Sequence, residues 1–266
     1  YFMQSAGWYG CSCPTLNYMD MFGNADGTSF NIDWDNIPQG VNPFDGRDPR
    51  LYETLVINGD KWQGRTAETY IGGQEQNTEN STRCRTGSVM RKFLREHDYA
   101  TLTGSVIHWP YLRLAEIYLS YAEALNELTG SYELPSWDGS KTHSISRNET
   151  EMKKGIRPIR IRAGLPDYTP DEYNNVDKFR MKLKRERQIE LFAEGHRYFD
   201  LRRWMDAPEE ESAPVYGCNV LATQEMREDF QTPVMCTSLP TIFAEKMWLW
   251  PCLLYTSPSP RDRQKS

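Results

Sequence analysis

Residues 183–204 of this chain read LKRERQIELFAEGHRYFDLRRW. Apolar side chains alternate there with Arg and Glu, so a helix over this stretch would bury charged groups beside apolar ones. Three acids, Glu186, Glu190 and Glu194, are spaced one helical turn apart and would repel one another if left alone. Bases on neighbouring turns offer partners, in the pairs Arg187 with Glu190, Glu194 with Arg197 and Lys182 with Glu186. The stretch therefore predicts a helix that is stabilised by a lattice of ion pairs.

Two chemical interpretations of this helix compete with a structural one. A nucleic-acid surface needs an uncompensated basic stripe, but acids interleave with the bases here and the chain carries a net charge of -6. A pair of carboxylates such as Glu190 and Glu194 is the equipment of a glycoside hydrolase. Acids within an ion-paired lattice are more often structural than catalytic. The structural interpretation is therefore favoured.

The same stretch contains the pattern ER-x2-EL-x2-EG-x-R-x2-DL-x-RW. It resembles the C-terminal signature of the SusD/RagB-like family, surface lipoproteins that bind nutrients and partner TonB-dependent transporters in Bacteroidetes-type bacteria. Further segments resemble family motifs in the same order, at residues 14–27, 42–52, 87–94, 109–126, 159–166 and 246–251. The resemblance implies a mostly α SusD-like fold, with tetratricopeptide-like helices, long loops and small β-hairpins.

The resemblance also predicts how the chain is organised. Residues 1–251 are expected to be the C-terminal portion of a single SusD/RagB-like domain, with the signal peptide and the N-terminal lipid anchor outside this fragment. Without the rest of the domain, we expect uncovered apolar faces at Leu112, Tyr118 and Leu119. Residues 252–266, beginning at Cys252, look like translated sequencing adapter. We expect this tail to be non-native and to have no packing partner.

Local patterns predict the main elements. Leu112, Ala115, Leu119, Ala122 and Leu125 form one apolar stripe of a helix over 110–128, with Tyr and Leu on an adjacent stripe, so this helix should lie between neighbours. A second helical stretch over 170–204, interrupted near its glycine at 195, should pack against it. Residues 129–155 contain Gly, Ser and Pro and are expected to be a connection, followed by a helix that ends at residue 164.

Other signals mark element boundaries. Asp48 before Pro49 predicts a helix start, because Asp can cap and Pro suits the first helical position. Residues 169–172 read TPDE, which predicts a capping box. Asn58 and Gly59 suit a tight turn, so residues 55–62 are expected to form a β-hairpin. Residues 14–22 predict a short helix and residues 87–94 a strand.

The sequence offers little that is typical of an enzyme. It has no phosphate loop, dinucleotide fingerprint or nucleophile placed beside a base. With Cys252 set aside an odd number of cysteines remains, and the pair Cys11 and Cys13 lacks zinc-site spacing. The four histidines are scattered. We therefore expect neither catalysis nor a metal or other cofactor.

Aromatic side chains in loops supply the candidate binding residues. Residues 1–50 are rich in Gly, Asn, Asp and Pro, and Trp or Tyr rings in such loops offer flat faces for stacking on sugar rings. The candidates are Trp8, Tyr9 and Trp34, with the polar neighbours Asn31, Asp33 and Asn36 to bond hydroxyl groups. The alternative is that these rings are buried anchors that hold the loops in place.

The resemblance then implies a function. It implies a cell-surface protein of the outer membrane that captures an oligosaccharide and delivers it to a SusC-like TonB-dependent transporter, without nucleic acid. Two alternatives remain open at this stage. One is a member of the same family that captures oligopeptides, and the other is a helical-repeat adaptor that binds only protein, which the helix at 110–128 would support.

Overall fold

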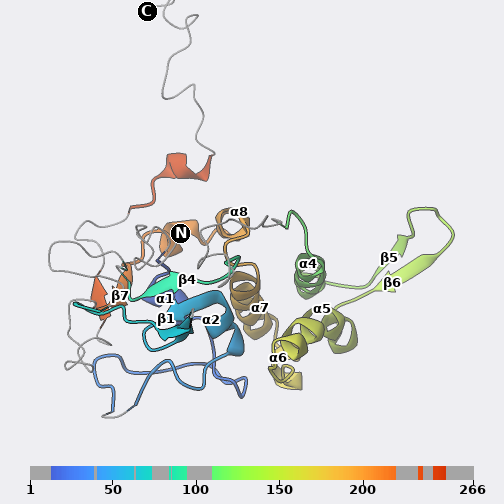
Figure 1. Cartoon of the computed structure of the whole chain (residues 1–266). Helices are drawn as coiled ribbons and strands as arrows, with labels where there is room; N and C mark the ends of the chain where they lie inside the picture. The colour runs from blue at the N-terminus through green and yellow to red at the C-terminus, as the bar shows by residue number, and fades with distance from the viewer. Residues whose placement is uncertain are drawn as a thin grey trace, which may run out of the picture. The chain divides into compact units, whose positions relative to one another are not determined.

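The computed structural model describes residues 13–38, 41–62, 64–73, 84, 86–94, 110–219, 233–235 and 242–249 (Figure 1). The chain divides into two compact units. The first comprises Tyr1–Glu194 and Val215–Cys236, and the second comprises Gly195–Pro214 and Thr237–Ser266. Within the described ranges, no helix is both long and apolar enough to span a lipid bilayer.

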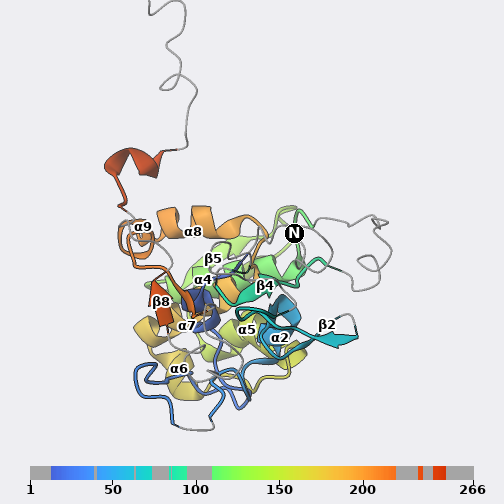
Figure 2. The ribbon, with the colours of Figure 1, turned by 60° about the vertical axis from the view of Figure 1, so that its left-hand side comes forward.

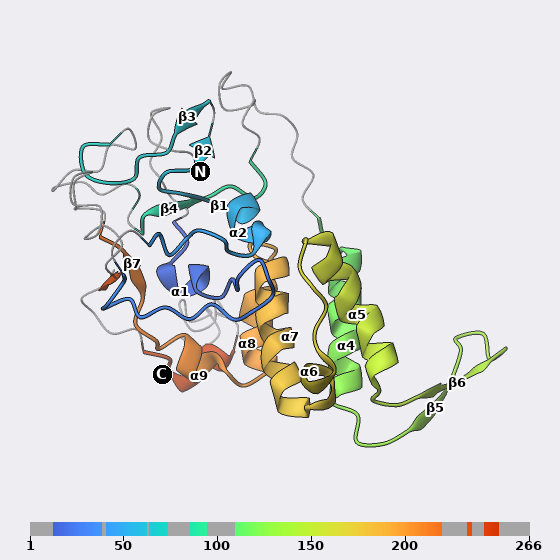
Figure 3. The same ribbon diagram turned by 90° about the horizontal axis from the view of Figure 1, so that it is seen from below.

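One part of the first unit combines short helices with small antiparallel sheets. Its helices are α1 (Leu16–Met19) and α2 (Pro49–Thr54). Its strands pair as β1 (Leu55–Ile57) with β4 (Ser88–Met90), β2 (Lys61–Trp62) with β3 (Arg65–Thr66), and β7 (Tyr216–Cys218) with β8 (Pro233–Met235). Strand β7 lies beside α1, where the Tyr216 amide donates to Asn17 Oδ1 at 2.8 Å (Figures 2 and 3).

The predicted hairpin over 55–62 is wrong. A turn does form at Asn58 and Gly59, and it is closed by a hydrogen bond of 3.1 Å from the Asp60 amide to the Ile57 carbonyl. However, β1 pairs with β4 and β2 pairs with β3, so the two strands that flank the turn do not pair with each other. The partner of β1 is remote in sequence, and buried β1 is matched to the largely buried β4, whereas β2 pairs with the strand that directly follows it.

The predicted helix starts are confirmed. Asp48 caps α2 by accepting from the Arg50 amide, with Pro49 at the first helical position. Thr169 and Glu172 form the predicted capping box of α6 (Pro170–Asn174). The short helix predicted over 14–22 is α1, and the strand predicted over 87–94 is β4.

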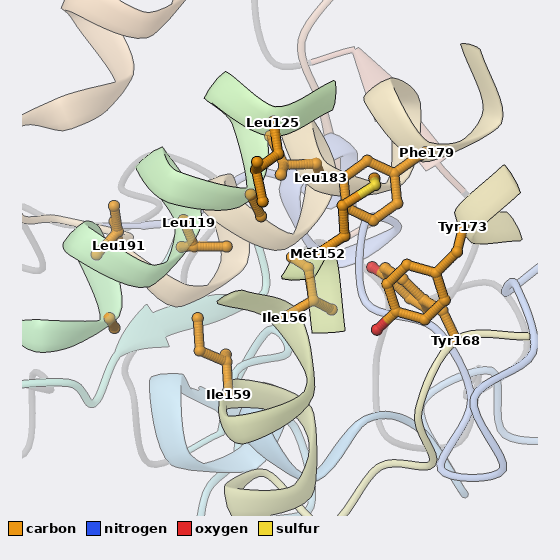
Figure 4. Close-up of a cluster of buried hydrophobic side chains, with 12 residues drawn as sticks. Leu119, Leu125, Met152, Ile156, Ile159, Tyr168, Tyr173, Phe179, Leu183 and Leu191 are labelled. Carbon is orange, nitrogen blue, oxygen red and sulfur yellow. The ribbon is translucent and has the colours of Figure 1, made fainter. Parts of the chain in front are cut away.

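Three longer helices form the other part of the first unit. These are α4 (Leu114–Asn126), α5 (Glu149–Arg162) and α7 (Val176–Glu190), and α4 packs against both of the others (Figure 3). Their shared core includes Leu119, Leu125, Met152, Ile156, Phe179 and Leu183 (Figure 4). The packing of the 110–128 helix against the 170–204 stretch is therefore confirmed.

The stripe predicted for α4 is only partly right. Ala115, Leu119, Ala122 and Leu125 are buried. The expectation that Leu119 would be uncovered is therefore wrong. Leu112 precedes the helix and is 65 % exposed, because α4 begins only at Leu114. The adjacent Tyr118 is half-buried. At the beginning of α4 and just before it, four large apolar side chains are exposed: Tyr111, Leu112, Leu114 and Ile117.

A glycine permits the close approach of α4 and α5. A Cβ atom on Gly155 would lie 2.5 Å from the Tyr118 carbonyl oxygen and 2.8 Å from the Ala122 Cβ. Real Cβ atoms do not come this close to backbone oxygen, so the two helices would have to separate to admit a side chain. The pairing of Gly155 with the small Ala122 therefore sets the distance between the helices.

The connection predicted over 129–155 contains regular structure. Strands β5 (Tyr132–Pro135) and β6 (Thr142–Ile145) form a hairpin that extends away from α4 and α5 (Figures 1 and 3). Helix α5 begins at Glu149, where the Asn148 side chain accepts from the Glu151 amide at 2.9 Å. The prediction missed both this hairpin and the first turns of α5, although the end of α5 just before Gly164 is as expected.

Helix α7 joins two hydrophobic cores. Leu183 belongs to the core shared with α4 and α5, whereas Ile189 lies in a second core with Tyr18, Phe22 and Leu51. The 183–204 stretch therefore connects the helical part of the first unit to the part that carries α1, α2 and the sheets.

The second unit begins at the predicted interruption. Gly195 has φ of 86°, a left-handed conformation that favours glycine, and it precedes α8 (His196–Arg203). The unit also contains α9 (Ala207–Glu210) and a 3-10 helix, η3 (Glu245–Trp248). The Arg202 side chain donates to the Met247 carbonyl at 3.0 Å and so links α8 to η3. The tail from Cys252 lies outside the described residues, and its non-native origin stays a prediction.

Candidate functional site

Three glutamates along α7 and the turn after it are buried. Glu186, Glu190 and Glu194 are between 3 and 9 % exposed. The same helix face presents Leu183 and Ile189 to the hydrophobic cores, so the acids are carried inward with the apolar residues. Buried carboxylates require charged or hydrogen-bonding partners. These partners come from other segments of the first unit.

Arginines from α2 and α5 bind the first two acids. Arg50 Nη1 lies 2.6 Å from Glu186 Oε1 and 3.4 Å from Glu190 Oε2. Arg160 Nη1 lies 3.3 Å from Glu186 Oε2, and Arg162 Nη2 lies 2.6 Å from Glu190 Oε2. These contacts connect the beginning of α2 and the end of α5 to the last turns of α7.

Two further bases reach the other end of the line. Arg113, which precedes α4, donates to Glu190 Oε1 at 2.9 Å and to both oxygens of Glu194 at 2.7 Å. Lys92, which follows β4, lies 2.6 Å from Glu194 Oε1. Five bases from four segments thus converge on three glutamates, and we call this set the α7 ion network: Glu186, Glu190, Glu194, Arg50, Lys92, Arg113, Arg160 and Arg162.

The predicted pairing on neighbouring turns is wrong where the structure tests it. Lys182 forms its ion pair with Glu172, at 2.5 Å, rather than with Glu186. Arg197 pairs with Glu210 inside the second unit, at 2.8 Å, rather than with Glu194. Lys182 and Arg197 thus bind acids outside the line of three glutamates, which are buried. Inward acids are reached by bases from packed segments.

The ion network keeps Glu190 and Glu194 charged. Burial raises the pKa of Glu190, but Arg162, Arg113 and Arg50 lower it by more, so its pKa lies below the usual range. Burial likewise raises the pKa of Glu194, while Arg113 and Lys92 bring it below the usual range. Every carboxylate oxygen of this pair is bound by a base. A general acid needs a raised pKa and access to substrate, so this pair gives no support to a glycosidase mechanism.

A small cavity lies beside the ion network. It is lined by polar side chains that include Asn24, Asp48, Arg50, Arg160 and Glu186, and its volume is about 40 Å³. A water molecule needs roughly 10–15 Å³ of such volume, and ligand sites are on the order of 300 Å³ or more. The cavity therefore accommodates a few waters and is too small for a sugar ring. In the described part of the chain, no group of three His, Cys, Asp or Glu side chains is placed to hold a metal ion.

Trp34 is held at the edge of a core. Its indole N–H donates to Asp20 Oδ2 at 2.9 Å, and its ring is half-buried against the core that contains Phe44. The ring centroids of Phe30 and Phe44 lie 6.2 and 6.1 Å from that of Trp34. Burial raises the pKa of Asp20 to about 6, although the Trp34 hydrogen bond opposes this shift. Trp34 thus anchors its loop while part of the side chain remains accessible.

Arg47 fixes the same loop from inside. Its guanidinium is fully buried and donates to the carbonyl oxygens of Met19, Phe22 and Pro43 at 2.7–3.2 Å. It also lies 3.2 Å from the centroid of the Phe30 ring, a cation–π contact. Arg47 therefore holds together the two segments between which the Trp34 loop runs, and it contacts the loop itself at Phe30.

The structure describes only some of the other residues that were predicted to contact a ligand. Asn36 Nδ2 donates to Asp33 Oδ2 at 2.8 Å, so this pair is exposed but already bonded internally, and Asn31 is exposed. Trp8 and Tyr9 lie outside the described residues. All three aromatic candidates remain predictions.

The sequence interpretation missed one aromatic residue. Trp137 is 98 % exposed at the tip of the β5–β6 hairpin. The signal was present, because Trp137 lies between Ser136 and the Asp138-Gly139 turn, a context as polar as that of Trp34.

Comparisons with known proteins agree with this architecture. The model of the SusD family matches residues 3–256. A SusD-like carbohydrate binding protein from Bacteroides fragilis NCTC 9343 is 23% identical, with a TM-score of 0.66 over 95% of this chain and 47% of that one. A SusD-like protein from the same organism is 24% identical, with a TM-score of 0.62 over 89% of this chain and 43% of that one. No curated protein sequence matches the chain.

These likenesses confirm the predicted SusD-like fold, with its helices and small antiparallel sheets. The chain spans less than half the length of each of the two solved structures. The family model covers nearly all of the chain, including the α7 ion network and the Trp34 loop. The chain therefore belongs to the SusD family.

Proposed function

We propose that this chain is part of the oligosaccharide-binding component of a TonB-dependent nutrient uptake complex. In this role it captures a glycan at the cell surface, on the outer membrane, and delivers it to a SusC-like transporter. The observation that carries the proposal is the family match over residues 3–256, together with the fold of a relative that is itself described as carbohydrate binding. No catalytic role is proposed.

The arrangement of the first unit supports a binding role. The α7 ion network joins four segments through buried contacts, so it makes a rigid support. The loop around Trp34 is tied to that support through α1 by Arg47 and Asp20. A half-exposed ring on a fixed loop can stack on a sugar with little loss of conformational freedom. Trp34, with Trp8 and Tyr9, is therefore our choice of stacking residues.

Calorimetric titration tests this function. The protein that contains this chain would be titrated with linear hexasaccharides of α-glucose, β-glucose, β-xylose and β-mannose, with host mucin glycans and with a mixture of short peptides. We expect a glycan to bind. Binding of peptides alone would move the proposal to the peptide-capturing alternative, and binding of neither would overturn nutrient capture.

Variants at Trp34 separate stacking from anchoring. A stacking ring should contribute roughly 1–3 kcal/mol to glycan binding, whereas loss of an anchor should cost about 3–5 kcal/mol of stability. Trp34→Ala removes both contributions, and Trp34→Phe keeps a flat ring but loses the hydrogen bond to Asp20. If Trp34 stacks, Trp34→Phe should keep most of the affinity and lose some stability. Unchanged affinity in Trp34→Ala would remove this residue from the site.

The exposed beginning of α4 favours a second candidate function. Leu112, Leu114 and Ile117 are 49 to 65 % exposed, which suits a helical-repeat adaptor that binds protein. The two functions differ in their partners. Purification of the protein from native membranes should recover a TonB-dependent transporter if nutrient capture is right, and Leu114→Ser should not abolish glycan binding. Recovery of another protein without glycan affinity would support the adaptor.

A further inference from the structure

The β5–β6 hairpin ends in a turn that is built from its own side chains. Asp138 Oδ1 accepts from Ser136 Oγ at 2.6 Å, from Ser140 Oγ at 2.8 Å and from the Ser140 amide at 3.1 Å. Ser136 Oγ in turn accepts from the Lys141 amide at 3.0 Å. Two backbone hydrogen bonds, of 2.8 and 2.9 Å, close the same turn. The tip is thus an ordered structure rather than a loose loop.

This ordered turn presents a tryptophan to solvent. Trp137 lies between Ser136 and Asp138, and 98 % of its surface is exposed. Tryptophan is ordinarily among the more buried residues. The backbone on both sides of the ring is fixed by the turn, so this segment of the protein loses little conformational freedom when a ligand stacks on the ring. An exposed and preorganised ring of this kind is typical of a binding contact.

The size of the exposed surface favours a small ligand. An aromatic side chain offers about 150–250 Å², and Tyr132 and Leu134 on the hairpin are each only about half exposed. Each partner in a stable protein–protein interface contributes roughly 800 Å². The hairpin surface falls short of that area, whereas a single sugar ring can be covered by one tryptophan face.

The polar groups beside the ring favour a ligand with hydroxyl groups. Asp138 uses Oδ1 for the turn, and those hydrogen bonds lower its pKa to about 2, so it is ionised at neutral pH. Its other oxygen, Oδ2, forms no hydrogen bond with any described residue and can accept one from a ligand. Lys141 is exposed, and its Nζ has no ion-pair partner in the described part of the chain. The turn that presents the ring therefore also carries an acceptor and a donor that are free among the described residues.

We propose that the tip of the β5–β6 hairpin is a second carbohydrate contact, in which Trp137 stacks on a pyranose ring while Asp138 Oδ2 and Lys141 Nζ bond its hydroxyl groups. The hairpin lies on the side of α4 and α5 away from α1, so this contact is separate from the Trp34 loop (Figures 1 and 3). The inference rests on the proposed glycan-binding function and extends it to longer or polymeric chains.

Fluorine NMR tests the contact directly. The protein is labelled with 5-fluorotryptophan, and the Trp137 resonance is assigned by its disappearance in Trp137→Phe. Each hexasaccharide named above is then added. We expect the Trp137 resonance to shift with the glycan that binds. Calorimetry of Trp137→Ala should show an affinity for that glycan lower by about tenfold, the loss typical of a central binding contact, with a smaller loss for Trp137→Phe.

Tyr111→Ala is the matched control, because Tyr111 is 93 % exposed but precedes α4 outside any such turn. It should leave glycan affinity unchanged. A glycan that binds the protein without shifting the Trp137 resonance, and binds Trp137→Ala with parental affinity, would overturn this inference while leaving the proposed function intact. Loss of a co-purified protein in Trp137→Ala, with glycan affinity unchanged, would show instead that the hairpin docks a protein. Binding of no glycan at all would overturn the proposed function and this contact with it.

Discussion

Removing Arg113 should destabilise the protein strongly. Arg113 donates to Glu190 and to both oxygens of Glu194, whose side chain is only 2 % exposed. Arg113→Met keeps the apolar stem but leaves Glu194 with Lys92 as its remaining ion-pair partner. Breaking a buried pair from one side costs about 3–5 kcal/mol. Because Arg113 is itself 25 % exposed and Lys92 remains, we expect the lower end, about 3 kcal/mol.

The measurement is urea unfolding followed by circular dichroism. The matched control is Arg180→Met, which breaks exposed ion pairs with Glu127 and Asp177 and should cost less than about 1 kcal/mol. The double variant Arg113→Met with Glu194→Gln should recover part of the loss, because the stranded charge is gone. If Arg113→Met costs no more than Arg180→Met, the α7 ion network does not hold the first unit together and our reasoning is refuted.

Three further predictions follow from other contacts. Gly155→Ala should lower the free energy of unfolding by about 1 kcal/mol or more, since overpacking against the Tyr118 carbonyl outweighs the gain in helix propensity; a stabilised variant in the same urea assay would contradict this. The raised pKa of Asp20, about 6 against 3.8, gives stability that is fully present below pH 3.8 and lost as pH rises through 6. The difference in unfolding free energy between wild type and Asp20→Asn should therefore fall between about pH 4 and 6 and then stay level. A difference that does not change with pH would contradict the raised pKa of Asp20. The isolated chain should bind a hydrophobic dye at the beginning of α4, and Leu114→Ser with Ile117→Ser should reduce the dye signal; an unchanged signal would place the apolar surface elsewhere.

Sequence reasoning succeeded where the deciding physics is local. The cap at Asp48 and the capping box at Thr169 each involve residues within three positions of one another. The interruption at Gly195 depends on the left-handed conformation of a single residue. Such signals need no knowledge of the tertiary fold, so they can be recognised in one sequence.

Sequence reasoning failed where the structure depends on which of several segments pairs with a given residue or strand. The Asn58-Gly59 turn was correct, but the pairing of β1 with β4 depends on which remote strand completes the buried surface. Lys182 is spaced correctly for Glu186, yet it binds Glu172 because Glu186 points inward to Arg50 and Arg160. The spacing along a helix shows which charged side chains are near enough to pair. Which of them do form ion pairs depends on which side chains are buried.

The candidate site shows the same limit. Trp34 and Trp137 both follow a polar residue and precede an Asp in a Gly- and Asp-containing segment. The structure half-buries the first against Phe44 and leaves the second almost fully exposed. Exposure of a loop aromatic depends on what packs against it. Trp34 packs against the core around α1, whereas Trp137 stands exposed at the hairpin tip. The composition of these loops therefore predicted that aromatic residues are candidates for binding, but not which of the aromatic rings is exposed to solvent.

The α7 ion network specifies how the segments of this chain come together, independently of its two aromatic segments. Buried ion pairs add little net stability compared with apolar packing, but a misplaced segment would leave a charge without a partner. Glu186, Glu190 and Glu194 each need bases from particular segments, so α2, β4, α4 and α5 must all arrive in their correct positions. Neither Trp34 nor Trp137 takes part in these contacts. Substitutions in the two aromatic segments can therefore alter ligand contacts without disturbing the groups that specify the fold.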